Sequence, residues 1–165
     1  MREQPEARAE LFRRYAPQVR RILFLQGYCE EVDDAVQEVF VKVFRARLPG
    51  EATFLAWFYR LILNTGRDMG RRRKTRADLA VRLREVAPTS EAREDPAPTE
   101  PALRDALAAL APEAREAVAL RFYADLSLEQ IATAQDVPLG TVKSRLHGAL
   151  KRLRGSLQEG ADARS

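Results

Sequence analysis

The residues of this chain with the clearest chemical potential are cations that gather in two short stretches. Seven lysines and arginines lie between Arg60 and Arg76, where Asp68 is the one acid. Five more lie between Thr141 and Arg154, where there is no acid. Cations concentrated in this way bind the phosphates of nucleic acids. The two stretches therefore predict contact with DNA at two separate places.

The first stretch carries its polar side chains on one face of an expected helix over 53–73. Steps of four, three and four residues bring most of them together on that face. Two aromatic residues beside them, Trp57 and Tyr59, could stack on unpaired bases, although Trp57 falls on the apolar side, which favours the core. The residues of this set, which are predicted to contact nucleic acid, are Arg60, Asn64, Arg67, Arg71 and Arg72.

The second stretch belongs to two expected helices around a tight turn, from Leu126 to Leu153. Ser127 and Gln130 have the spacing of a capping box, and Asp136, Pro138 and Gly140 supply turn chemistry. This layout indicates a helix-turn-helix whose second helix enters the major groove. A plain helical hairpin with a solvated basic face is the alternative. The residues predicted to contact duplex DNA are Thr141, Lys143, Ser144, Arg145 and His147.

A third polar set opens an expected helix over 33–44, whose apolar stripe includes Val36, Val39 and Phe40. Acids at the start of a helix interact favourably with its dipole. Capping therefore explains this set as well as docking on a basic protein does. The set consists of Asp33, Asp34, Gln37 and Glu38.

The remaining composition excludes several classes of protein. His147 is the single histidine and Cys29 the single cysteine, so we expect no catalytic site, metal site or cofactor, and no enzyme activity. Cys29 is best explained as an ordinary thiol in a reducing compartment. The chain has neither a secretory signal nor an apolar run long enough to span a membrane. A cytoplasmic protein is predicted.

Helical periodicity covers most of the chain outside one acidic, proline-rich stretch. Residues 85–101 hold four prolines and five acids, a composition that cannot form a core. A helix could extend into the start of the linker over 78–86. We predict an all-α protein with two small helical domains, 1–75 and 102–158, a flexible linker over 76–101 and a disordered tail over 159–165.

These motifs also resemble a known family. DDAVQEVFVKVF (33–44) followed by TFLAWFYRLILNTGRDMGRRR (53–73) resembles region 2 of bacterial sigma factors, and residues 106–154 resemble region 4. Because only a linker separates them, the chain is similar to the extracytoplasmic-function (ECF) group. The resemblance extends over residues 8–155.

The resemblance implies a promoter-specificity subunit whose partners are core RNA polymerase and promoter DNA, with an anti-sigma factor as a candidate. It implies that the Asp33 set docks on the polymerase clamp helices and that the Arg60 set meets the −10 region. The resemblance further implies that the Thr141 set lies on the −35 recognition helix. The loop over 46–53 corresponds to the one that captures a flipped base.

The chain departs from the family at two places. Gly148 stands where an arginine is common, and the loop before Thr53 is short and lacks an aromatic residue. These departures keep open a second class, a decoy that binds polymerase or an anti-sigma factor but opens no promoter. A third class is a dimeric helix-turn-helix regulator that works without polymerase, but such a protein needs neither the Asp33 set nor the basic stretch from Arg60 to Arg76.

Overall fold

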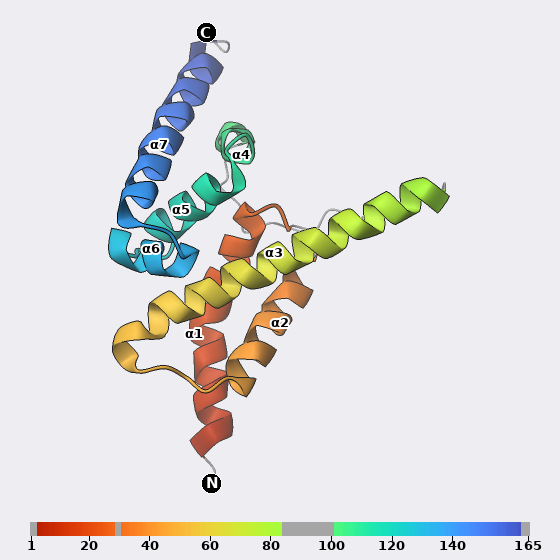
Figure 1. Ribbon diagram of the computed structural model, residues 1–165, viewed down its shortest axis with the longest axis vertical. Coiled ribbons are helices and arrows are strands. Elements are labelled where there is room, and N and C mark those ends of the chain that lie inside the picture. Colours follow the sequence, from red (N-terminus) through yellow and green to blue (C-terminus); the bar gives the residue numbers. More distant parts are fainter. Residues whose placement is uncertain (1–2, 29–30, 84–100, 163–165) are drawn as a thin grey trace.

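Every regular element in the described part of the chain is an α-helix. The computed structural model describes residues 3–28, 31–83 and 101–162, and seven helices lie within these ranges (Figure 1). The prediction of an all-α protein is confirmed. Cys29, the residue 30 beside it and most of the expected linker lie outside the described residues.

Three helices form the first bundle: α1 (Glu3–Leu25), α2 (Val32–Arg45) and α3 (Glu51–Leu83). Their apolar stripes meet in a core in which Ile22, Val39 and Phe58 are almost fully buried. The aromatic rings of Phe40 and Phe58 pack at a centroid distance of 6.3 Å. The inward positions expected for α2, Val36, Val39 and Phe40, are thus confirmed.

Four helices form the second bundle: α4 (Pro101–Ala108), α5 (Pro112–Phe122), α6 (Leu128–Gln135) and α7 (Leu139–Asp162). The capping box is present: the backbone N–H of Gln130 donates to Ser127 Oγ at 3.2 Å, and the backbone N–H of Ser127 donates to Gln130 Oε1 at 2.9 Å. The turn passes through Asp136 in the left-handed region (φ 57°). The helix-turn-helix is therefore confirmed.

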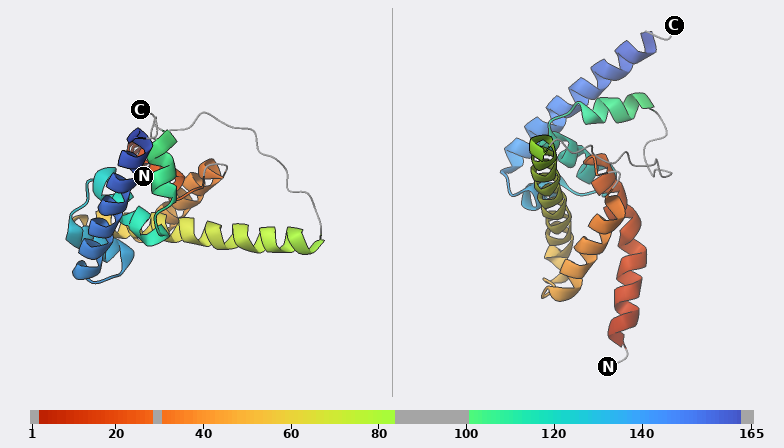
Figure 2. Two further views of the ribbon diagram at one scale, coloured as in Figure 1. Left: turned by 90° about the horizontal axis from the view of Figure 1, so that it is seen from above. Right: turned by 90° about the vertical axis from the view of Figure 1, so that its right-hand side faces the viewer.

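Two helices are longer than the expected boundaries. α3 continues past residue 75 to Leu83, and its C-terminal half projects away from the other helices (Figures 1 and 2). α7 continues to Asp162, into the stretch expected to be a tail. Alanine, leucine and arginine predominate in the extension of α3, and these are good helix formers.

The aromatic residues beside the basic stretch have different surroundings from one another. Tyr59 is 2% exposed, and its hydroxyl donates to Gln18 Oε1 at 2.9 Å. The prediction that Tyr59 stacks on bases is therefore wrong, because its ring lies in the core. Trp57 is half-buried and packs against that core, as its apolar side predicts.

The two bundles pack against each other. α6 lies along α3, and α5 and α4 contact α1; the first of these contacts is visible in Figure 1. Arg21 of α1 lies over the ring of Tyr123, which follows α5, at 4.2 Å from the centroid. The sequence indicated two tethered domains and gave no sign of this contact.

Candidate nucleic-acid and polymerase interface

The face of α3 that carries Arg60 and Arg67 is turned toward the second bundle. Arg60 Nη2 lies 3.1 Å from Asp136 Oδ2, at the end of α6. Arg67 forms a two-pronged ion pair with Glu116 of α5: Nε to Oε1 at 3.0 Å and Nη2 to Oε2 at 2.6 Å. Such forked pairs are among the strongest charge-assisted hydrogen bonds. Hydrogen bonding to Glu116 raises the pKa of Arg67, and burial opposes this effect.

Glu116 is the centre of this contact. Glu116 is 3% exposed. Its carboxylate accepts hydrogen bonds from Arg67 and also from Gln135 Nε2, at 3.1 Å. A buried carboxylate that loses its one cation costs about 3–5 kcal/mol. The pair is therefore a substantial part of the contact between the bundles.

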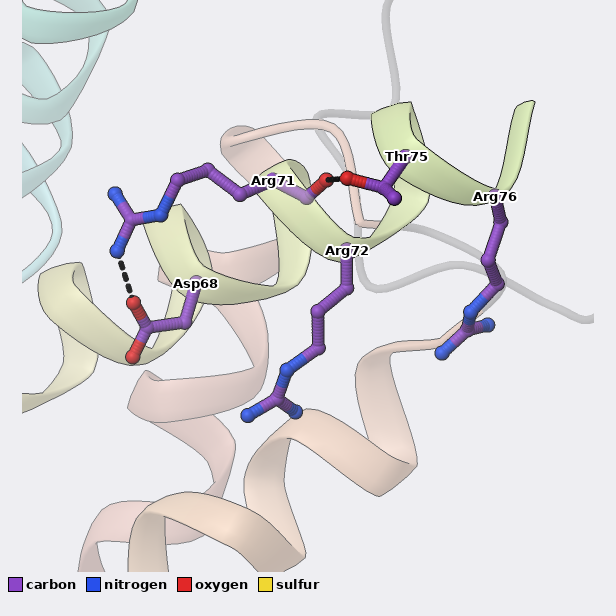
Figure 3. Close-up of a pocket in the computed structure, with 5 residues that line it drawn as sticks. All are labelled: Asp68, Arg71, Arg72, Thr75 and Arg76. Carbon is purple, nitrogen blue, oxygen red and sulfur yellow. Dashed lines mark hydrogen bonds and ion pairs between the residues drawn. The ribbon is translucent and has the colours of Figure 1, made fainter. Parts of the chain in front are cut away.

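The other predicted residues of α3 are open to solvent. Asn64, Arg71 and Arg72 are exposed. Arg72 and Arg76 point toward α2, whereas Arg71 points along the opposite side and pairs with Asp68 (Figure 3). An open hollow of about 630 Å³ is lined by Asp68, Arg71, Arg72, Thr75 and Arg76. The predicted set thus divides into two members that pair with carboxylates of the second bundle, Arg60 and Arg67, and three exposed members that do not.

The second helix of the helix-turn-helix presents the predicted duplex-reading face. Lys143, Ser144 and His147 are exposed, while Val142 and Leu146 on the other side are buried. Thr141 is half-buried, and its carbonyl accepts from Ser144 Oγ at 3.0 Å. Arg145 is half-buried and donates to Gln135 Oε1 at 3.1 Å. The five residues lie together at the start of α7, as predicted.

The polar set on α2 is partly occupied by ion pairs. Asp33 pairs with Arg20 of α1. Glu38 pairs with Lys42 at 2.9 Å and with Arg72 at 3.2 Å. Burial disfavours ionised Glu38, but these two cations outweigh that effect and hold the pKa of its carboxyl below the ordinary value. Asp34 and Gln37 are exposed, so they remain open to a partner.

The loop between α2 and α3 borders a hollow of about 310 Å³. Its aromatic walls come from Tyr15 of α1 and Phe54 of α3, and Leu48 and Pro49 supply the loop side. The loop lacks an aromatic residue of its own, as the sequence indicated. The sequence reasoning missed that neighbouring helices supply the rings instead.

The sequence reasoning also missed two residues that connect the bundles, Glu116 and Asp136, together with Gln135, which holds Glu116 within the second bundle. Glu116 directly precedes the apolar run Ala117–Leu120 of α5, and a buried carboxylate needs a partner. Nothing in the sequence identifies Arg67 as that partner, because the two residues belong to different domains.

Two features are absent from the part of the chain that the structure describes. None of its helices is long and apolar enough to cross a membrane. It contains no group of His, Cys, Asp and Glu side chains that could hold a metal ion.

The two helical bundles match family models in the expected order. Residues 11–76 match the model of sigma-70 region 2, and residues 106–155 match that of sigma-70 region 4. The fold and its basic faces therefore define an RNA polymerase sigma factor, the class that directs promoter-specific transcription initiation.

Relatives place the chain more narrowly. It is 37% identical to the ECF RNA polymerase sigma factor SigE of Mycolicibacterium smegmatis over 161 residues, which are 90% of this chain and 60% of that protein. It is 30% identical to the ECF RNA polymerase sigma-E factor of Haemophilus influenzae over 163 residues, 90% of this chain and 86% of the relative. The chain belongs to the ECF group of sigma-70 factors.

Solved structures share the fold. The sigma factor RpoE of Bartonella quintana, in complex with the anti-sigma factor NepR, superposes with a TM-score of 0.72 at 22% identity and covers 91% of this chain and 96% of its own. CnrH in complex with the cytosolic domain of CnrY gives a TM-score of 0.67 at 25% identity, with 94% and 90% covered.

Proposed function

We propose that this sigma factor directs core RNA polymerase to promoters by reading a −35 duplex element with α7 and a −10 element with α3. The observation that carries the proposal is the start of α7, where Lys143, Ser144 and His147 project from a helix whose opposite side is buried. A helix presented in this way can reach base edges in the major groove.

Opening the −10 element requires a different surface. Extruding a base costs a few kcal/mol of unstacking, so a protein needs cations along the strand and a pocket for the base. The exposed residues Arg71 and Arg72 supply the cations, and the exposed Asn64 on the same helix adds a neutral hydrogen-bonding amide. The hollow between Tyr15 and Phe54 offers aromatic walls for the pocket, because rings stack on bases of any sequence.

Docking on core polymerase is assigned to the exposed acidic and amide side chains of α2. Asp34 and Gln37 extend to solvent beside the paired residues Asp33 and Glu38. The role is regulatory and not enzymatic, and its place is the cytoplasm. The B. quintana neighbour is bound to an anti-sigma factor, which supports an anti-sigma factor as a further partner of this chain.

Runoff transcription tests the proposal. Core polymerase with the full chain should start transcripts at defined positions on a library of promoters, and core alone should not. Two variants separate the elements: Lys143→Ala with Ser144→Ala should change which −35 sequences are used, and Asn64→Ala should reduce permanganate reactivity of the melted strand. Duplex binding without any transcript would instead identify a regulator that works alone. Polymerase binding without a transcript would identify a decoy.

A further inference from the structure

Two of the α3 residues assigned to the −10 strand, Arg60 and Arg67, contact the second bundle of the same chain. α6 lies along α3 (Figure 1), and two of the guanidinium groups on that face are bound by carboxylates of the second bundle. Arg60 pairs with Asp136 at 3.1 Å, and Arg67 pairs with Glu116 at 2.6 Å. In this arrangement the Nε and Nη2 donors of Arg67 are occupied, and the charge of Arg60 is paired with Asp136 through one hydrogen bond.

The chemistry of the two ligands is equivalent. A guanidinium presents a planar fork of N–H donors that fits a carboxylate and a phosphate alike. Glu116 satisfies the fork of Arg67 with both of its oxygens. A DNA strand that contacts Arg67 must therefore displace Glu116, and with it the bundle that carries Glu116.

The contact also has features of one that opens. The side chains of Asp136 and Arg60 are 76% and 45% exposed, and pairs this exposed contribute little to stability. Arg115 Nε is buried without a hydrogen-bond partner, and Arg115 Nη1 lies 3.9 Å from the place where a side chain on Gly27 of the first bundle would begin. A buried donor without a partner opposes the contact that buries it.

Glu116 keeps hydrogen bonding inside its own bundle when the contact opens. Gln135 Nε2 donates to it at 3.1 Å, and Gln135 Oε1 accepts from Arg145 of the recognition helix at 3.1 Å. A continuous polar chain thus runs from Arg67 through Glu116 and Gln135 to Arg145, and it joins a residue of the −10 face to one of the −35 face.

We propose that the free chain is held closed by Glu116 and Asp136, which occupy Arg67 and Arg60 in place of the phosphates of the melted −10 strand. The closed contact and the strand compete for the same two guanidinium groups, so the bundles separate before the strand binds. The closure of the two bundles does not depend on the proposed function. The identification of the competing ligand as the −10 strand does rest on that function.

The test uses the full chain without polymerase and two conservative variants. Asp136→Asn removes one carboxylate at a left-handed position that asparagine tolerates well. Asp125→Asn is the matched control: Asp125 is also exposed and left-handed (φ 53°), and it forms no ion pair with the described residues. Both variants raise the net charge by one, so general attraction to DNA changes equally.

Two quantities are measured: the radius of gyration by solution X-ray scattering, and the affinity for a fluorescein-labelled single-stranded DNA by anisotropy. Asp136→Asn should increase the radius and bind the strand about 2- to 5-fold more tightly than Asp125→Asn, as expected for loss of one exposed ion pair. Glu116→Gln should act in the same direction and more strongly.

Three results would overturn the proposal, and none requires transcription. If Asp136→Asn matches Asp125→Asn in both quantities, there is no closure through Asp136. If the radius grows without tighter strand binding, closure exists but does not compete with DNA. If the wild-type chain is already extended, no closure exists. If runoff transcription fails but the scattering and anisotropy results are as expected, the proposed function is contradicted and the closure between the bundles still holds.

Discussion

Arg145 Nη1 and Gln135 Oε1 lie 3.1 Å apart, and this hydrogen bond ties the recognition helix to the interior of its bundle. Gln135 is 4% exposed and donates in turn to the carbonyl of Glu113 at 2.8 Å and to Glu116 at 3.1 Å. A guanidinium has five N–H donors, so one bond to Gln135 leaves donors of Arg145 for DNA. We therefore predict that Arg145 both orients the helix and contacts the groove.

Arg145→Ala should therefore reduce two quantities at once. Loss of a phosphate contact lowers the magnitude of the salt slope of −35 duplex binding by about one. The buried Oε1 of Gln135 loses its donor, which costs about 1–3 kcal/mol of stability. Anisotropy titrations at several salt concentrations measure the first effect, and thermal unfolding measures the second.

Lys143→Ala is the matched control for Arg145, because Lys143 is exposed on the same turn of α7. It should lower the salt slope without lowering the melting temperature. An Arg145→Ala protein with an unchanged slope and unchanged affinity would exclude Arg145 from the DNA interface. An unchanged melting temperature would exclude the orienting role.

The acidic surface of α2 gives a second prediction. Asp34→Lys with Gln37→Lys should weaken binding to core polymerase about tenfold or more, because like charges placed across an interface cost several kcal/mol. Both side chains are exposed, so the melting temperature should stay constant. Glu38→Lys should lower both the affinity for core polymerase and the melting temperature, since it puts a cation beside Lys42 and Arg72.

Competition against a labelled sigma factor for core polymerase measures this affinity. Glu6→Lys, an exposed charge reversal on α1, controls for two of the three charge units that the double variant adds. If Glu6→Lys and the double variant compete equally well, α2 does not form the docking surface.

Two helical glycines give opposite expectations. A Cβ at Gly148 of α7 would meet no atom within 4 Å, so Gly148→Ala should stabilise the chain by about 0.5–1 kcal/mol through helix propensity alone. A Cβ at Gly66 of α3 would lie 2.2 Å from Gln26 Oε1 and 3.1 Å from the Tyr28 ring. Gly66→Ala should destabilise it by about 1–3 kcal/mol.

Urea unfolding of the two variants side by side tests this contrast. A loss of stability in Gly148→Ala would mean that the glycine is required at the recognition helix for a reason other than space. Equal effects of the two substitutions would contradict the close approach of Tyr28 and Gln26 to α3.

The local features of the fold could be predicted because each depends on residues near one another in the sequence. The capping box at Ser127 and the stripe of Val36, Val39 and Phe40 are examples. Contacts between the bundles could not, since they depend on side chains far apart: nothing near Arg67 indicates that it binds Glu116. The occupation of Arg60 and Arg67 thus follows from tertiary structure alone.

The buried hydroxyl of Tyr59 makes stability depend on alkaline pH. Burial raises the pKa of Tyr59 from 10.0 to about 12, because the core does not solvate a phenolate. A raised pKa means that the folded chain holds the proton more tightly than the unfolded chain. The contribution of Tyr59 is therefore complete below pH 10 and is lost as the pH rises toward 12, by roughly 2–3 kcal/mol in all.

Tyr59→Phe separates this effect from general alkaline unfolding. At pH 8 the variant should be less stable by about 1 kcal/mol, because the hydrogen bond to Gln18 is lost. Between pH 9 and 11.5 its free energy of unfolding should fall less steeply than that of the wild type, and denaturant titrations across this range measure the slope. Tyr123→Phe, which changes a half-exposed tyrosine outside the first bundle's core, is the control. Parallel pH profiles for wild type and Tyr59→Phe would show that the phenol of Tyr59 ionises as readily in the folded chain as in the unfolded one.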